Sequence, residues 1–194
     1  LYNRGNLTII YSVFRGMAPV FVAILSIIFL KDLISLRGLL GIGIIAFGLV
    51  LLTVENYKNK LNIKLLIISI FVSIIISLYT FAGGAGVRSV DNEFTFIVWN
   101  FFLGGWPTLG YVYLKKGNQL FKLNLKQYIS ITIASFMSIT AYTIILWSMK
   151  YQPIAYVASI RESSIIMASL IGFVFLKEKF TGIRFVSAAM FFVG

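Results

Sequence analysis

The chain has 194 residues, of which 59% are apolar and 12% are charged, and its formal net charge is +11. A soluble globular protein carries about twice that share of charged residues, so the composition predicts an integral membrane protein. Cysteine and histidine are both absent from the sequence, which excludes disulfides, thiol catalysis, Ser-His-Asp chemistry and the usual zinc and haem ligands. Lysines and arginines at the ends of membrane helices explain the positive charge, so the expected partner is the lipid bilayer and not nucleic acid. We expect no cofactor, no metal and no catalytic residues.

Seven apolar segments have the length and the flanking charges of membrane helices. They cover residues 7–30, 36–54, 61–83, 94–114, 127–148, 153–176 and 182–194. Their near-continuous apolar runs favour helices over the alternating strands of a membrane barrel, so the expected fold is an all-α multi-helix bundle. The chain starts at Leu1 instead of Met, and its last segment would rise only about 20 Å, too little to span a bilayer. We therefore expect a fragment of a longer protein.

The segments 7–30 and 153–176 share a pattern of residues at a fixed distance. A shift of 146 positions places Arg161 on Arg15 and Glu178 on Asp32. The same shift also places Phe175 on Phe29, Leu176 on Leu30, Lys177 on Lys31 and Gly194 on Gly48. The two segments are five crossings apart, an odd number, so the copies would cross the membrane in opposite directions. This predicts an inverted-topology repeat, which is a common architecture of transporters.

The repeat predicts how the chain is divided. Residues 1–54 would end the first repeat, residues 55–60 would connect the repeats, and residues 61–194 would form the second repeat with a truncated last helix. Shifting residue 61 back by 146 positions implies about 85 missing residues, enough for three short-looped helices. We therefore expect the full protein to have ten helices in two inverted five-helix repeats.

Glycines, prolines and hydroxyls predict local features of these helices. Gly41 and Gly48 are seven residues apart and share a face on which another helix can approach closely. Pro19 and Pro107 each remove a backbone donor, so both are candidate kinks. The glycine-rich stretch 81–88 matches no phosphate-loop spacing, and we interpret it as a frayed helix end and turn. A polar stripe on the segment 127–148 could line a water-filled path or bond to a neighbouring helix. The stripe consists of Ser135, Ser138 and Tyr142.

Arg15 lies within an apolar segment, where a charge costs at least a few kcal/mol unless it faces protein or water. Tyr11, Arg15 and Pro19 are spaced by four, so they share one face of a helix. Pro19 also leaves the carbonyl of Arg15 without its helical partner. A kink beside a buried cation is a plausible binding feature, because broken helices often mark substrate sites. The alternative is that Arg15 only pairs with an acid on another helix.

Arg161 and Glu162 lie near the middle of another apolar segment. Neighbouring side chains on a helix diverge by about 100°, so we expect these two not to face each other. Glu162 is the only acid inside any of the segments, which leaves a surplus positive charge beside Arg15 and Arg161. A surplus cation would suit an anionic or zwitterionic substrate, and Glu162 is a candidate proton-coupling residue. A fixed Arg–Glu strut between the two helices is the alternative.

Several stretches of the sequence resemble EamA-type carriers of the drug/metabolite transporter superfamily. Residues 5–19, followed by Leu30-Lys31-Asp32, resemble the fourth helix of these carriers. Residues 153–164, followed by Leu176-Lys177-Glu178, look like the ninth helix, and residues 147–153 resemble the segment that leads into it. The chain departs from the family pattern at Lys31 and Lys177, where the family usually has glycine before the acid. The family's first three helices are also absent.

The resemblance implies two inverted repeats around a central cavity, alternating access and a multi-pass location in the plasma or inner membrane. Family substrates are small metabolites, amino acids and drugs, which are often exported. On this basis the candidate substrate-binding residues are Tyr11, Arg15, Tyr142, Arg161 and Ser164. The expected function is a secondary-active exporter, and the oligomeric state is left open. A lipid-group flippase of the same superfamily is the nearest alternative. A membrane-embedded enzyme has thin support, because a lone buried Glu without His or Cys is a poor catalytic set.

The charges at the helix ends bear on orientation. Eleven basic residues belong to one side, which the positive-inside rule places in the cytoplasm. They are Arg4, Lys58, Lys60, Lys64, Lys115, Lys116, Lys122, Lys126, Lys177, Lys179 and Arg184. The other side has four, which are Lys31, Arg37, Arg88 and Lys150. The usual arrangement of the family places the larger set outside, and we favour the charge count.

Overall fold

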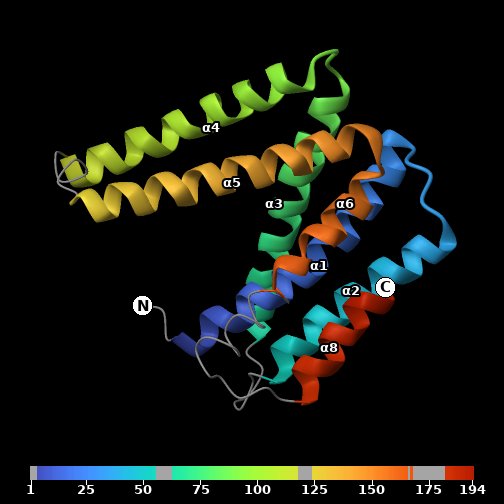
Figure 1. The fold of residues 1–194 in the computed structure, drawn as a ribbon. Helices are drawn as coiled ribbons and strands as arrows, with labels where there is room; N and C mark the ends of the chain where they lie inside the picture. Colours follow the sequence, from blue (N-terminus) through green and yellow to red (C-terminus); the bar gives the residue numbers. More distant parts are fainter. Residues whose placement is uncertain (1–3, 56–62, 118–123, 166, 168–181) are drawn as a thin grey trace. The chain divides into compact units, whose positions relative to one another are not determined.

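The computed structural model describes the backbone of residues 4–55, 63–117, 124–165, 167 and 182–194, and it contains seven helices and no strand in those ranges (Figure 1). The helices are α1 (Arg4–Leu30), α2 (Leu36–Glu55), α3 (Ile63–Arg88), α4 (Glu93–Lys116), α5 (Leu125–Tyr151), α6 (Ile154–Arg161) and α8 (Gly182–Val193). The predicted all-α fold is confirmed. The apolar segments determine these helices because their flanking charges and turn residues mark where an apolar run stops.

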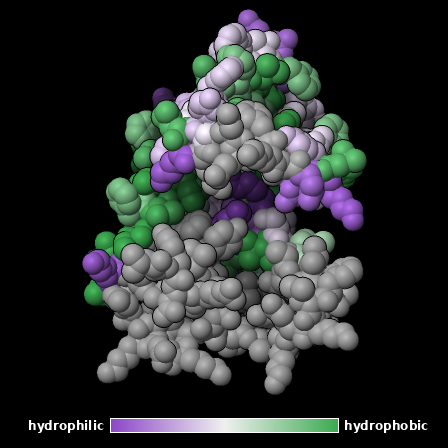
Figure 2. All heavy atoms as spheres, turned by 90° about the vertical axis from the view of Figure 1, so that its left-hand side faces the viewer, coloured by the Kyte–Doolittle hydropathy of each residue, from purple (hydrophilic) through white to green (hydrophobic). Residues whose placement is uncertain are grey.

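Two of the described helices have the length and composition of membrane-spanning segments. Leu66–Arg88 and Leu125–Tyr151 are each long and apolar enough to cross a bilayer, and Arg15–Leu30 and Leu36–Leu51 are shorter apolar helices. Large apolar side chains are exposed along the long helices: Phe29 (67%), Leu40 (61%), Phe71 (62%), Leu103 (62%) and Phe136 (71%). Figure 2 shows hydrophobic residues, in green, among the described residues on this face. Such a surface suits lipid, because outward-facing apolar groups lose nothing in hydrocarbon.

The chain divides into two compact units. Unit 1 comprises residues 1–83 and 152–194, and unit 2 comprises residues 84–151. In unit 1, α1 packs against α2 and α6, and α2 packs against α8. Small and branched side chains fill this core, including Ala18, Val22, Leu49, Ile154 and Ala158. In unit 2, α4 and α5 pack against each other. The predicted boundaries of the sequence repeats, 1–54, 55–60 and 61–194, stay a prediction.

Helices α1 and α6 run in opposite directions. Asp32, which follows the end of α1, contacts the start of α6 at Ile154. Arg15, farther back in α1, contacts Glu162 just beyond the end of α6. An inverted repeat requires this antiparallel arrangement, because α1 and α6 contain the two repeated segments.

Helices α2 and α8 are also antiparallel, and the positions in contact are equivalent in the two copies of the sequence repeat. A Cβ atom added at Gly41 would overlap the carbonyl oxygen of Gly194, and one at Gly48 would lie 3.3 Å from the carbonyl oxygen of Ser187. The shift of 146 positions relates Gly41 to Ser187 and Gly48 to Gly194. Each copy therefore contacts the other through the same two positions, as at an isologous interface. The predicted close approach at Gly41 and Gly48 is confirmed.

Two of the expected helix boundaries are wrong. The stretch 81–88 is not a frayed end and turn, because α3 continues through it to Arg88. The glycine at position 86 leaves the space that the ring of Phe96 occupies, and Arg88 Nε donates a 2.7 Å hydrogen bond to the carbonyl of Met149. The expected continuous helix 153–176 is interrupted, since α6 ends at Arg161 and Glu162 forms a turn. Residues 168–181 of that segment lie outside the described residues.

Candidate functional site

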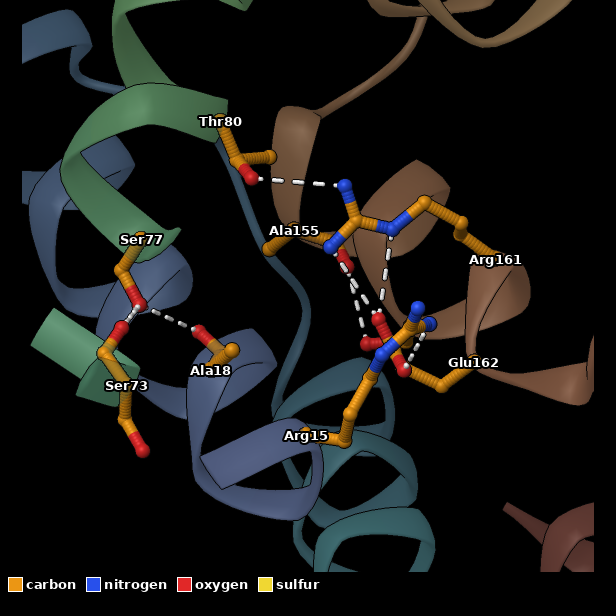
Figure 3. Close-up of polar contacts among 9 residues, drawn as sticks. Arg15, Ala18, Ser73, Ser77, Thr80, Ala155, Arg161 and Glu162 are labelled. Carbon is orange, nitrogen blue, oxygen red and sulfur yellow. Dashed lines mark hydrogen bonds and ion pairs between the residues drawn. The ribbon is translucent and has the colours of Figure 1, made fainter. Parts of the chain in front are cut away.

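Unit 1 contains a partly buried ion pair between α1 and the end of α6 (Figure 3). Arg15 Nη1 donates to Glu162 Oε2 at 3.1 Å, and the Glu162 side chain is completely buried. Glu162 sits here because the helix tightens at this residue. Its backbone N–H bonds to the carbonyl of Ser159 at 3.1 Å, three residues earlier, and its own carbonyl accepts from Ile165 N at 3.0 Å. Bonds between residues three apart are typical of a tight 3₁₀ turn, which ends the regular helix.

Arg161, the residue directly before Glu162, is the third member of the cluster. Its Nε and Nη2 atoms donate to Glu162 Oε1 at 3.2 and 3.1 Å, and its Nη1 donates to Thr80 Oγ1 at 3.4 Å. The expectation that Arg161 and Glu162 do not face each other is therefore wrong. The long Arg161 side chain folds back over the helix end until its guanidinium group reaches the carboxylate (Figure 3). A regular-helix angle between Cβ directions does not limit so flexible a side chain.

Hydroxyl groups of α3 face this cluster and α1. Ser77 Oγ lies 2.6 Å from the carbonyl oxygen of Ser73 and 3.0 Å from that of Ala18 in α1. One turn further on, Thr80 accepts the bond from Arg161. Ser69, Ser73, Ser77 and Thr80 are all buried and recur at intervals of four, four and three residues. This periodicity of hydroxyls along an apolar helix was visible in the sequence, and it would have identified α3 as a neighbour of the charges.

The predicted site residues are brought together only in part. Arg15, Arg161 and Glu162 form one cluster, whereas Tyr142 belongs to unit 2, where its ring lies 5.5 Å from that of Phe101. Ser164 is exposed in the short helical stretch after the turn. Tyr11 lies in α1, one turn before Arg15, but its side chain is outside the described part of the structure. The substrate-binding role of all these residues stays a prediction.

The two prolines lie inside helices. Pro19 is buried in α1, one turn after Arg15, and Pro107 is exposed within α4. Proline cannot donate a helical hydrogen bond, so each leaves one carbonyl without its helical partner. The predicted kinks at these two positions stay predictions.

The cluster carries more positive than negative charge. It contains two guanidinium groups and one carboxylate, a surplus of one positive charge. The other acidic side chain that the structure describes in unit 1, Asp32, bonds to the opposite end of α6. Among the described residues there is no group of three or more metal-ligating side chains. Two guanidinium groups beside one carboxylate could contact an anionic group.

The fold and the cluster define a class of protein. Apolar helices with exposed hydrophobic surfaces and ionised groups buried among them belong to an integral membrane protein with a polar interior site. A family model of the EamA-like transporter family matches residues 63–194, more than half of the chain. The chain belongs to this family, and it is a membrane transporter of the drug/metabolite transporter superfamily. No curated protein and no solved structure matches the chain.

Proposed function

We propose that the protein is a secondary-active carrier that exports small metabolites, amino acids or drugs across the plasma or inner membrane by alternating access. The observation that carries this proposal is the buried cluster of Arg15, Glu162 and Arg161 with its surplus positive charge. The cluster lies at the turn that ends α6, and α6 is antiparallel to α1. In transporters with inverted repeats, interrupted helices of this kind hold the substrate near the middle of the membrane.

The charge of the cluster suggests the chemistry of the substrate. A surplus guanidinium group is costly in the membrane unless it is compensated, and a carboxylate or phosphate of the substrate would compensate it. Arginine suits this role because its planar fork can grip two oxygens at once. We therefore propose that the substrate carries at least one anionic group and that this group contacts the cluster.

A comparison of metabolites inside and outside cells, with and without the gene, tests the proposed transport. We expect at least one small carboxylate or phosphate compound to accumulate outside only when the gene is expressed. Arg15→Ala should weaken transport of that compound at normal protein abundance, and Arg15→Lys should restore it only in part, because lysine lacks the fork. If the compounds that move are lipid-linked and stay in the membrane fraction, the protein is a flippase and not a metabolite exporter.

Glu162 is the candidate proton-coupling residue of this proposal. Glu162→Gln should leave a folded protein that exchanges substrate but no longer accumulates it when only a pH difference is imposed, because exchange needs no net proton movement. A purely structural ion pair predicts a different result. Removing one partner of a buried pair costs about 3–5 kcal/mol, so transport would then fall in step with protein abundance. Accumulation driven by a pH difference in reconstituted Glu162→Gln protein would exclude the proton role.

A further inference from the structure

The two arginines of the cluster differ in how far their side chains are exposed. All three side-chain nitrogens of Arg161 bond to partners that are almost completely buried, since Nε and Nη2 contact Glu162 and Nη1 contacts Thr80. The Arg161 side chain is 17% exposed, whereas that of Arg15 is 28% exposed. Arg161 is thus the more enclosed of the two guanidinium groups, and its bonds define one orientation.

We propose that Thr80 is a positioning residue that holds Arg161 against Glu162, so that Arg15 is the arginine that contacts the anionic group of the substrate. This inference rests on the proposed function and deepens it, because it assigns different roles to two arginines that the sequence repeat makes equivalent. Arg161 would serve as the fixed counter-ion of Glu162. Arg15 would exchange part of its contact with Glu162 for the substrate.

The placement of Thr80 supports this role. Thr80 is 3% exposed and lies on α3, a helix that contributes no charged residue to the cluster. Its β-branched side chain has few rotamers in a helix, so its hydroxyl offers Arg161 an acceptor at a defined position. One turn earlier, Ser77 Oγ lies 3.0 Å from the carbonyl oxygen of Ala18 in α1. Two hydroxyls of α3 therefore contact the surroundings of Glu162: that of Ser77 contacts the backbone of α1 at Ala18, and that of Thr80 contacts Arg161 (Figure 3).

Loss of the Thr80 hydroxyl would leave Arg161 Nη1 without its acceptor. A buried donor without a partner is unfavourable, so the guanidinium group would leave its present orientation to find another acceptor or water. Glu162 would then lose one of its two cationic partners. Arg15 would have to compensate Glu162 more completely, and it would be less able to contact a substrate.

Chemical modification of arginine measures this arrangement without a known substrate. The protein in lipid vesicles is treated with phenylglyoxal, and modification of each arginine is followed by mass spectrometry of chymotryptic peptides. We expect Arg15 to react faster than Arg161 in the wild type, and inorganic phosphate or acetate to protect Arg15. Thr80→Val, which keeps the shape and removes the hydroxyl, should raise the rate at Arg161 about three- to tenfold, the effect of losing one hydrogen bond of ordinary net strength.

Two control variants separate positioning from a general loss of structure. Thr80→Ser keeps the hydroxyl and should keep the wild-type rate at Arg161. Ser73→Ala removes a hydroxyl that is equally buried in α3 but donates within its own helix, to the carbonyl of Ser69 at 2.8 Å, and should also leave Arg161 unchanged. A higher rate at Arg161 in Ser73→Ala would overturn the specific role of Thr80.

The outcomes distinguish this inference from the proposed function. An unchanged rate at Arg161 in Thr80→Val overturns the positioning role, even if phosphate still protects Arg15 and so supports an anion site. Protection of Arg161 instead of Arg15 overturns the assignment of roles. If the rate at Arg161 rises as expected but neither anion protects either arginine, the positioning role holds, and the proposed contact between an anionic substrate and Arg15 fails.

Discussion

The carboxylate of Asp32 accepts a 3.1 Å hydrogen bond from the backbone N–H of Ile154. Asp32, the second residue after α1, therefore caps the first turn of α6, whose own N-cap residue, Pro153, makes no side-chain hydrogen bond to it. With the Arg15–Glu162 pair at the other end, α6 is attached to α1 at both of its ends. A helix of only eight residues is marginal by itself, so these two contacts help to define where it lies.

Removal of the Asp32 cap should destabilise the protein. We expect Asp32→Ala to lower the free energy of unfolding by about 1 kcal/mol, the usual loss when a helix cap is removed. Asp32→Asn should lose much less, because its amide oxygen can still accept the bond from Ile154. Unfolding of the detergent-solubilised protein measures both variants. Equal losses in Asp32→Asn and Asp32→Ala would show that the charge of Asp32 matters and the cap does not.

Lys31, the residue directly after α1, has a backbone conformation that favours glycine. Its φ angle is +55°, in the left-handed region that is unfavourable for residues with a Cβ atom. Glycine, the residue that the resemblance to EamA-type carriers implies at this position, adopts this conformation without strain. We expect Lys31→Gly to raise the free energy of unfolding by up to about 1 kcal/mol. Lys31→Ala keeps the strained Cβ atom and should give no such gain; a similar gain in both variants would assign the effect to the lysine charge.

The α2–α8 contact allows a matched comparison of two glycines on one helix. A Cβ atom at Gly41 would overlap the backbone of Gly194, whereas one at Gly43 would meet nothing within 4 Å. We expect Gly41→Ala to destabilise the protein by about 1–3 kcal/mol through overpacking. Gly43→Ala should be neutral or slightly stabilising, because alanine favours the helix. Unfolding measurements on both variants check this, and equal effects would contradict the packing of α2 on α8.

The contribution of the start of α4 to the free energy of unfolding should depend on pH. Glu93 precedes the apolar segment 94–114, and Lys150 Nζ donates to its carboxylate at 2.7 Å. This hydrogen bond holds the pKa of Glu93 below its ordinary value of 4.5. A lowered pKa stabilises the folded state above the unfolded pKa, and that stabilisation is lost as the pH falls through the folded pKa. Wild type should therefore be more stable than Glu93→Gln near pH 7, and the difference should vanish on acidification. A difference that stays constant over the pH range would exclude an ionic contribution.

Membrane orientation can be read from single cysteines, because the chain has none of its own. Ser89 lies before α4, and Leu125, 75% exposed, begins α5 after it. The positive-inside rule places the side of Leu125 in the cytoplasm. We expect a membrane-impermeant maleimide to label Ser89→Cys but not Leu125→Cys in intact cells. The reverse labelling would show that the charge count is misleading for this chain. Gly117 is unsuitable for the probe, since its φ angle is +54°.

The sequence alone was sufficient to predict the membrane class, the all-α fold and most helix boundaries. These depend on local properties, namely the length of apolar runs and the charges that flank them. The residues that became the charged cluster were also recognisable, because an ionised side chain within an apolar segment is unfavourable without a partner. The shift of 146 positions further indicated that the segments of α1 and α6 run in opposite directions, as the structure shows.

Only the tertiary structure decided which groups meet. Arg15 and Glu162 are 147 residues apart, and their contact depends on how α1 and α6 are rotated and how closely they pack. At the turn that ends α6, both carboxylate oxygens of Glu162 bond to arginines, one of them on another helix. Thr80 gains its importance in the same way, since a threonine in an apolar helix is unremarkable until a guanidinium group from another helix reaches its hydroxyl.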